Sequence, residues 1–194
     1  MDERFPSSLA SAKNEAAHER LFFALWPSPE AAAELAGWAR AAHSLCGGRI
    51  MQPETLHMTL AFLGSTPRAR VDELVHVAAG WPVSLGALTL RHLGRFKRPN
   101  IVWAGPADGE TDRIAWLDSL YDMLWIRLES MGWHRPESAF RPHVSLLRNA
   151  GPGKLDSLSC SPIFWRPEQC VLVASRPNVP ESRYQVLTRL PVQE

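Results

Sequence analysis

A histidine and a threonine stand two positions apart in the apolar stretch "ETLHMTLAFLG". They are His57 and Thr59. Because successive side chains of a β-strand point to opposite faces, a strand here places the imidazole and the hydroxyl on one face. The same alternation predicts that Met58, Leu60 and Phe62 form the other face and point into the core.

The pattern returns in "FRPHVSLLRNA", which places His143 and Ser145 on one face and Val144 and Leu146 on the other. Two imidazoles form a natural acid–base pair near neutral pH, because the unperturbed pKa is about 6.5. A hydroxyl two residues along each strand can bind a phosphoryl oxygen. One H-x-[ST] motif arises readily by chance among seven histidines. Two of them, each followed by leucine in an apolar strand, favour one site built from two strands.

Other catalytic chemistries lack their motifs in this sequence. The three cysteines form no C-x-x-C pair, and neither H-E-x-x-H nor G-x-S-x-G occurs. We therefore expect reduced thiols, no metal and no other cofactor.

The composition fits a single domain. The chain has 194 residues, 45% of them hydrophobic and 21% charged, and a net charge of +1. That charge argues against nonspecific coating of nucleic acid. No apolar run approaches the roughly 20 residues of a membrane span, and the charged start resembles no signal peptide. We expect a cytoplasmic monomer, with residues 1–19 as an extension, mobile or a short helix, and residues 20–194 as one domain.

The surrounding elements must bring the two motif strands together. Apolar periodicity, capping residues and turn residues predict the order β-α-β-α-β-β-α-β-β-β. A helix precedes each H-x-[ST] strand, which indicates a faint internal duplication. Besides the two motif strands, the predicted strands are 20–26, 83–96, 100–105, 170–175 and 183–191, and the predicted helices are 28–46, 67–80 and 110–132.

The paired motifs resemble the two signature motifs of the 2H phosphoesterase superfamily. "RLFFALWPSPE", "LGRFKRPNIVWAG" and "RYQVLTRLP" are similar to segments of its RNA 2′,3′-cyclic phosphodiesterase branch, the LigT-like or 2′-5′ RNA ligase family. The resemblance covers about residues 20–192. It implies a bilobal α+β fold, in which two pseudo-symmetric lobes of antiparallel strands carry outer helices and enclose a central cleft.

The resemblance also implies an activity. It is metal-independent hydrolysis of a ribose 2′,3′-cyclic phosphate, at an RNA 3′ end or on a nucleotide, to a 2′-phosphate, with reverse 2′-5′ ligation as a further option. His57 is expected to be the proton donor and His143 the proton acceptor. Thr59 and Ser145 are expected to hold nonbridging phosphate oxygens.

Four further residues are candidates for substrate binding. Arg141 is either a surface arginine or a phosphate contact beside His143, and Arg148 is a second phosphate candidate. The basic turn that contains Arg98 is either a solvated turn or a rim that guides an RNA backbone. Phe140, or Trp103, can stack on a base.

Two other functions remain open from the sequence. The first is a 2H phosphoesterase that acts on a different phosphodiester, such as a 2′-5′ oligonucleotide or a cyclic ADP-ribose product. The second is a noncatalytic module that binds RNA ends on the same scaffold. Retention of both histidines and both hydroxyl residues favours an enzyme.

Overall fold

The computed structural model describes residues 18–106, 113–176 and 184–193. The strands in these ranges are β1 (His18–Leu25), β2 (Arg49–Ile50), β3 (Met58–Pro67), β4 (Val83–Ser84), β5 (Leu88–Leu90), β6 (His92–Phe96), β7 (Ile101–Gly105), β8 (Val144–Arg148), β9 (Ile163–Trp165), β10 (Cys170–Ser175), β11 (Tyr184–Arg189) and β12 (Val192–Gln193). The helices are α2 (Pro29–Cys46), α3 (Arg68–Ala78) and α4 (Ala115–Ser130), with 3-10 turns at Pro53–Thr55 and Leu155–Ser157.

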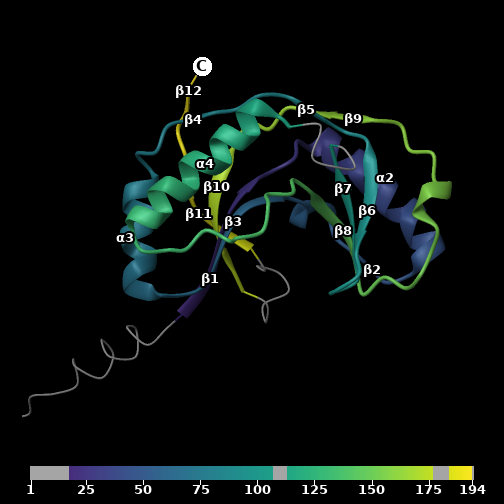
Figure 1. Cartoon of the computed structure of the whole chain (residues 1–194), viewed down its shortest axis with the longest axis horizontal. Helices are drawn as coiled ribbons and strands as arrows, with labels where there is room; N and C mark the ends of the chain where they lie inside the picture. The colour runs from purple at the N-terminus through teal and green to yellow at the C-terminus, as the bar shows by residue number, and fades with distance from the viewer. Residues whose placement is uncertain (1–17, 107–112, 177–183, 194) are drawn as a thin grey trace, which may run out of the picture.

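The main sheet has the strand order β11-β10-β1-β3-β8-β7-β6, with β2 also paired to β8. Its central strands β3 and β8 are antiparallel and meet at a single registered pair, Met58 with Val144. Strands β1, β3, β10 and β11, with α3 and α4, lie to one side of this junction, and β6, β7 and β8, with α2, lie to the other (Figure 1). The prediction of two lobes of antiparallel strands with outer helices is confirmed.

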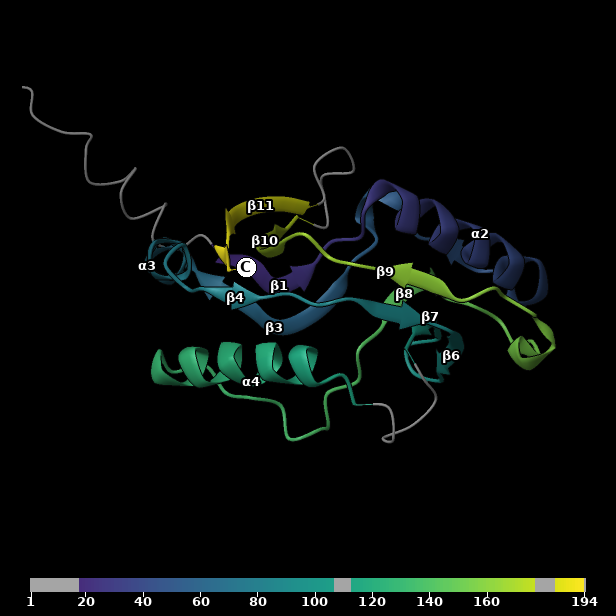
Figure 2. The ribbon, with the colours of Figure 1, turned by 90° about the horizontal axis from the view of Figure 1, so that it is seen from above.

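The helices cover both sides of the strand layer. Viewed from above, α4 and α2 lie on opposite sides of it (Figure 2). Helix α2 begins as predicted, with the Ser28 hydroxyl accepting a hydrogen bond from the amide of Ala31 and Pro29 in the first turn. It ends at Gly47, whose φ of 58° suits glycine.

Strand β1 is buried on both of its faces. Leu21, Phe23 and Leu25 point into the main core with the apolar faces of the helices. A second, smaller cluster lies on the other face of the sheet and consists of Phe22, Ala24, Val171 and Val173. Because this second cluster packs against Trp26 and Tyr184, the sheet has an aromatic wall on the face opposite Leu21, Phe23 and Leu25.

Several elements differ from the sequence predictions. The strand expected over 83–96 is three short strands, and the short strands β9 and β12 were not predicted. Helix α4, Ala115–Ser130, is shorter than the predicted helix 110–132. The first three residues of that prediction, 110–112, lie outside the described residues. Strand β1 begins at His18, so two residues of the expected extension belong to the sheet; residues 1–17 are not described. None of the helices in the described ranges has the length and apolar character needed to cross a membrane.

Candidate active site

The junction of the two lobes brings the four predicted catalytic side chains together. Since Met58 is paired with Val144, the antiparallel register sets His57 beside Ser145 and Thr59 beside His143. Side chains directly opposite in such a pair have Cβ atoms about 5 Å apart, and the diagonal pair, here the two histidines, about 7–8 Å. Each imidazole therefore lies next to the hydroxyl of the other lobe, with room for a small anion between the two rings.

Both motif strands carry a bulge at the same place. Strand β3 has two extra residues opposite β1, Leu60 and, further along, Leu63, and β8 has one extra residue, Leu146, opposite β7. Leu60 and Leu146 are the corresponding pair. Both Leu60 and Leu146 are the third residue after the histidine of their motif. A bulge reverses the alternation of the side chains that follow. The fifth residue after each histidine, Phe62 in β3 and Arg148 in β8, is consequently turned toward the face that carries the histidines.

The prediction that Phe62 belongs to the core is wrong, and this bulge is the reason. Its side chain is 51% exposed, whereas Met58 and Leu60 are buried as expected. Phe62 pairs across the sheet with Phe22, and the Phe22 ring stacks on His57 at a centroid distance of 4.8 Å. Phe62 therefore lies on the site face of the sheet.

His57 lies among aromatic rings. Besides Phe22, the ring of Trp26 stacks on it at 5.4 Å, and Tyr184 meets it edge-on at 5.2 Å. Its Nδ1 donates a hydrogen bond of 2.7 Å to the carbonyl oxygen of Thr55. This aromatic wall was not predicted from the sequence, although the alternation of Phe22, Ala24 and Trp26 in "RLFFALW" is a signal for it.

His143 has a matching environment in the other lobe. Its Nδ1 donates a 2.8 Å hydrogen bond to the carbonyl oxygen of Arg141. Phe96 and Trp103 meet its ring edge-on, at centroid distances of 4.9 and 6.1 Å. The indole of Trp103 lies so close to Gly94 that a Cβ at that glycine would overlap it, so glycine is required at this position.

The two hydrogen bonds fix the tautomers. A carbonyl oxygen can only accept, so Nδ1 carries the hydrogen in both rings, and each Nε2 has a free lone pair when the ring is neutral. In both cases the acceptor is the carbonyl two residues before the histidine. The duplicated motif thus orients both imidazoles in the same way, with the reactive nitrogen free to face the site.

Burial lowers the pKa of both histidines. The pKa of His57 falls to about 4, chiefly by burial, and the positive charges of Arg148 and His143 contribute. The pKa of His143 is also lowered, by burial first and then by the charge of Arg141. The free site therefore favours neutral rings at neutral pH. A bound anion favours their protonation, because it attracts the imidazolium form.

A cavity of about 980 Å³ opens beside His143 and Thr59. It is bounded by β3, by α4 and by the segment that leads into β8. Phe62, Phe96 and Trp103 line it, and the rings of Phe96 and Trp103 also contact His143. Its far wall is charged and includes the Arg135–Asp122 ion pair of 2.5 Å. The cavity can therefore accept a ligand much larger than a phosphate group.

The structure distributes the predicted substrate-binding residues unevenly. Arg148 lies near enough to His57 to lower its pKa, and its Nε is buried without a hydrogen-bond partner among the described residues. Arg141 and Phe140 line the cavity, where Phe140 stacks on Tyr121 at 4.1 Å. Arg98 is exposed in the turn between β6 and β7 and is not among the lining residues.

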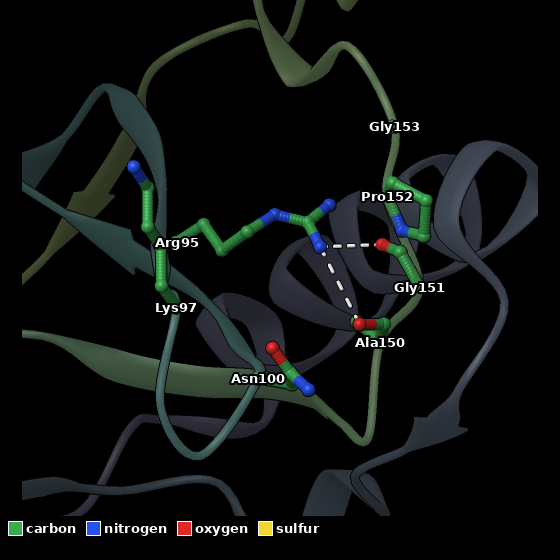
Figure 3. A pocket seen from close by; sticks show the side chains of 7 residues that line it. All are labelled: Arg95, Lys97, Asn100, Ala150, Gly151, Pro152 and Gly153. Carbon is green, nitrogen blue, oxygen red and sulfur yellow. Dashed lines mark hydrogen bonds between the residues drawn. The ribbon is translucent and has the colours of Figure 1, made fainter.

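A second hollow, of about 390 Å³, lies beside the basic turn (Figure 3). Here the Arg95 guanidinium donates to the carbonyl oxygens of Ala150 and Gly151 and, over 2.9 Å, to the Cys46 sulfur. Arg95 therefore ties β6 to the loop after β8 and to the end of α2. Of the basic residues near this turn, Lys97 and Arg98 are exposed.

Within 18–106, 113–176 and 184–193, no three histidine, cysteine, aspartate or glutamate side chains gather in a way that could hold a metal ion.

Comparison with known proteins gives consistent results. Residues 25–103 match the family model described as LigT like Phosphoesterase. The RNA 2′,3′-cyclic phosphodiesterase of Escherichia coli is 31% identical over 133 residues, which cover 68% of this chain and 73% of that protein. The enzyme of the same name from Aeropyrum pernix is 30% identical over 120 residues, covering 60% and 66%.

Solved structures show the same similarity. The apo structure of Escherichia coli LigT aligns with a TM-score of 0.71 and 28% identity, over 92% of this chain and 100% of that one. Its complex with 3′-AMP aligns with a TM-score of 0.73 and 26% identity over the same shares.

Proposed function

Because the chain belongs to the LigT-like phosphoesterase family, we propose that it hydrolyses ribose 2′,3′-cyclic phosphates, at RNA 3′ ends or on nucleotides, to 2′-phosphates. The observation that carries the proposal is the crosswise arrangement at the β3–β8 junction, where each histidine lies beside the hydroxyl of the other lobe. The names of the relatives support the substrate. The four side chains come from one chain, so the reaction needs no second copy.

Each histidine has one task in the proposed mechanism. His143 Nε2 accepts a proton from a water molecule as the water oxygen attacks phosphorus. The P–O3′ bond breaks, and His57 Nε2 gives its proton to the departing O3′. The products are a 3′-hydroxyl and a 2′-phosphate. The total charge of the two histidines is unchanged, because His143 gains one proton and His57 loses one. If the 5′-hydroxyl of a second RNA replaces water, the same steps form a 2′-5′ linkage.

The neighbouring polar groups stabilise the charge that develops on phosphorus. Thr59 and Ser145 donate hydrogen bonds to the nonbridging oxygens. Arg148 supplies a positive charge from the site face of β8, and its unbonded Nε supports this role, because a buried donor without a partner is costly. Arg141 adds a second charge on the cavity side, with Phe140 beside it.

Arg98 has a more distant role in this proposal. It lies outside the cavity, at the exposed end of the β6–β7 hairpin, where it can contact only an RNA that extends beyond the site. Its contribution is therefore expected to depend on the length of the RNA and on salt concentration.

The lowered pKa values predict an acid-shifted pH dependence of kcat/KM. Catalysis needs one proton on the pair, and that state is populated between the two pKa values of the free enzyme. Both values lie below the ordinary 6.5, one of them at about 4. We expect a bell-shaped profile with its maximum below pH 6.5, measured by initial rates on a nucleoside 2′,3′-cyclic phosphate. A maximum well above neutrality would contradict the assignment of the two histidines.

Product analysis tests the proposed function directly. An RNA with a defined 2′,3′-cyclic phosphate end, incubated with the protein and excess EDTA, is expected to give an RNA with a 2′-phosphate. Enzymatic digestion or mass spectrometry after selective removal of a 3′-phosphate separates the two products. Formation of a 3′-phosphate, or a strict need for added divalent metal, would overturn the mechanism. Binding of the RNA end without turnover would identify a noncatalytic module.

A further inference from the structure

The hydrogen bonds of the two histidines do not explain why their roles differ. Both rings donate from Nδ1 to the carbonyl oxygen two residues earlier, and both leave Nε2 free for the site. The proposed reaction nevertheless needs the two rings in opposite protonation states, with His57 protonated and His143 neutral. The aromatic rings around the two imidazoles are where the lobes differ.

His57 lies between the faces of two aromatic rings. Phe22 stacks on it at a centroid distance of 4.8 Å and an interplanar angle of 27°, and Trp26 at 5.4 Å and 21°. These two residues are four positions apart, about 13 Å in an extended chain, so their rings approach the imidazole from opposite directions along the strand. Ala24 lies between them on the same face, and its methyl group leaves space for the imidazole.

The third ring of the aromatic wall comes from β11. Tyr184 is nearly perpendicular to the stacked rings, with its centroid 5.2 Å from that of His57, 5.4 Å from that of Phe22 and 6.2 Å from that of Trp26. It therefore covers the stack from the side and holds it together.

The charges that act on His57 do not favour its protonation. Those of Arg148 and His143 both lower its pKa, as burial does, and the hydrogen bond to the Thr55 carbonyl raises it. No carboxylate of the described residues is among the groups that raise this pKa. The protonated ring therefore depends on other stabilising contacts.

The surroundings of His143 are different. Among the described residues no ring stacks on it, since Phe96 meets it at an interplanar angle of 83° and Trp103 at 63°. The guanidinium of Arg141 lies over the ring of Phe96, 5.9 Å from its centroid, so a cation already occupies that π face. His143 thus has less to stabilise a positive charge than His57.

A cation over the face of an aromatic ring is attracted by the quadrupole of the ring, most strongly where water is excluded. One such contact in a buried site corresponds to a change of about 1 in the pKa. The two stacked faces therefore oppose the effect of burial on His57.

We propose that the aromatic wall of Phe22, Trp26 and Tyr184 stabilises the imidazolium form of His57 and thereby gives this histidine the role of proton donor. The three residues are positioning residues, because they act on the reaction only through His57. The inference rests on the proposed function and supplies a physical cause for the difference between acid and base.

Replacement of Trp26 by phenylalanine or by leucine tests the first stacked face. Both changes remove the indole, but only phenylalanine keeps a π face. Histidine NMR titration is expected to give a His57 pKa about 1 lower in Trp26→Leu than in Trp26→Phe. Added sulfate, whose charge favours the imidazolium form, moves the transition toward neutral pH, where the fold is more stable. Equal values in the two variants, or a higher value with leucine, would overturn the proposal.

Phe22→Leu tests the second stacked face. A packing defect at this buried position would admit water and raise the pKa of His57, because burial is the main cause of its lowering. Loss of the π face lowers the pKa further, so the sign of the change separates the two explanations. Phe164→Leu replaces an exposed phenylalanine of β9 and should leave the pKa unchanged. A raised or unchanged pKa in Phe22→Leu would contradict the role of this ring.

Turnover separates this inference from its premise. Fewer molecules carry the proton on His57 in Trp26→Leu, so its maximal kcat/KM should be about 10-fold below that of Trp26→Phe, with the acid limb at lower pH. If the wild-type protein opens no 2′,3′-cyclic phosphate, the proposed function fails, whereas the titrations still decide whether the wall stabilises the imidazolium. If turnover falls while the pKa values stay equal, the role of the wall is refuted and the hydrolase remains.

Discussion

Replacement of His57 or of His143 by alanine lowers kcat by about 10²- to 10⁴-fold, the usual contribution of a general acid or base. Each ring supplies one Nε2 to the site and is held by its own Nδ1 hydrogen bond, so neither can take over the task of the other. The double variant should lose little more than the worse single variant, because both groups act in one step. Single-turnover rates on a 2′,3′-cyclic phosphate measure these losses.

Two comparisons separate loss of chemistry from loss of structure. Asparagine at either position can still donate to the carbonyl two residues before it but has no Nε2, so His57→Asn and His143→Asn should be as inactive as the alanine variants. His76→Ala changes an exposed histidine on α3 and should retain normal turnover. If either asparagine variant kept near-normal turnover, that histidine would not be the acid or the base.

The paired histidines were accessible to sequence reasoning because their placement depends on short-range geometry. Two side chains at positions i and i+2 share a face in any strand, and this holds for His57 with Thr59 and for His143 with Ser145. The sequence of either strand alone does not show that the two strands lie next to each other. The duplicated motif predicted the pairing, and the Met58–Val144 register explains why each histidine ends beside the other lobe's hydroxyl.

The sequence prediction failed at Phe62 because strict alternation cannot reveal a bulge. The extra residue at Leu60 depends on how β3 fits against β1, which is a tertiary property. The bulge at Leu146 has the same effect on Arg148. If the two motifs are compared with a bulge allowed at the third residue after each histidine, the alternation places Phe62 and Arg148 on the site face.

Long side chains near the turn were equally hard to place from sequence. Arg95, Lys97 and Arg98 are close neighbours in the sequence "RFKRPN". In the structure, however, Arg95 alternates to the face opposite Phe96 and donates to carbonyl oxygens and a cysteine sulfur. Its partners lie some fifty residues away on each side along the chain. Only the packing of α2 against the loop after β8 makes those partners available.

Replacement of Arg148 by methionine is expected to lower kcat/KM by about 10²-fold, which is typical for loss of one group that stabilises charge on the reacting phosphate. Methionine keeps the apolar stem and removes the charge. The variant should also shift the pH profile. The charge of Arg148 lowers the pKa of His57, so its removal raises that pKa, and the acid limb of kcat/KM moves to higher pH. The limb set by His143 should stay in place, because Arg141 and not Arg148 acts on that ring.

The pH shift identifies an electrostatic role of Arg148 only if β8 keeps its structure. A loosened β8 would expose His57 and would also raise its pKa, because burial is the main cause of the lowering, so Arg148→Met must keep the wild-type thermal unfolding midpoint. Arg166→Met removes an exposed arginine after β9 and should change neither the rate nor the profile. NMR titration of the His57 ring in the free protein gives the same pKa independently of turnover. If that pKa were unchanged in Arg148→Met, Arg148 would not be close enough to the histidine pair to hold the reacting phosphate.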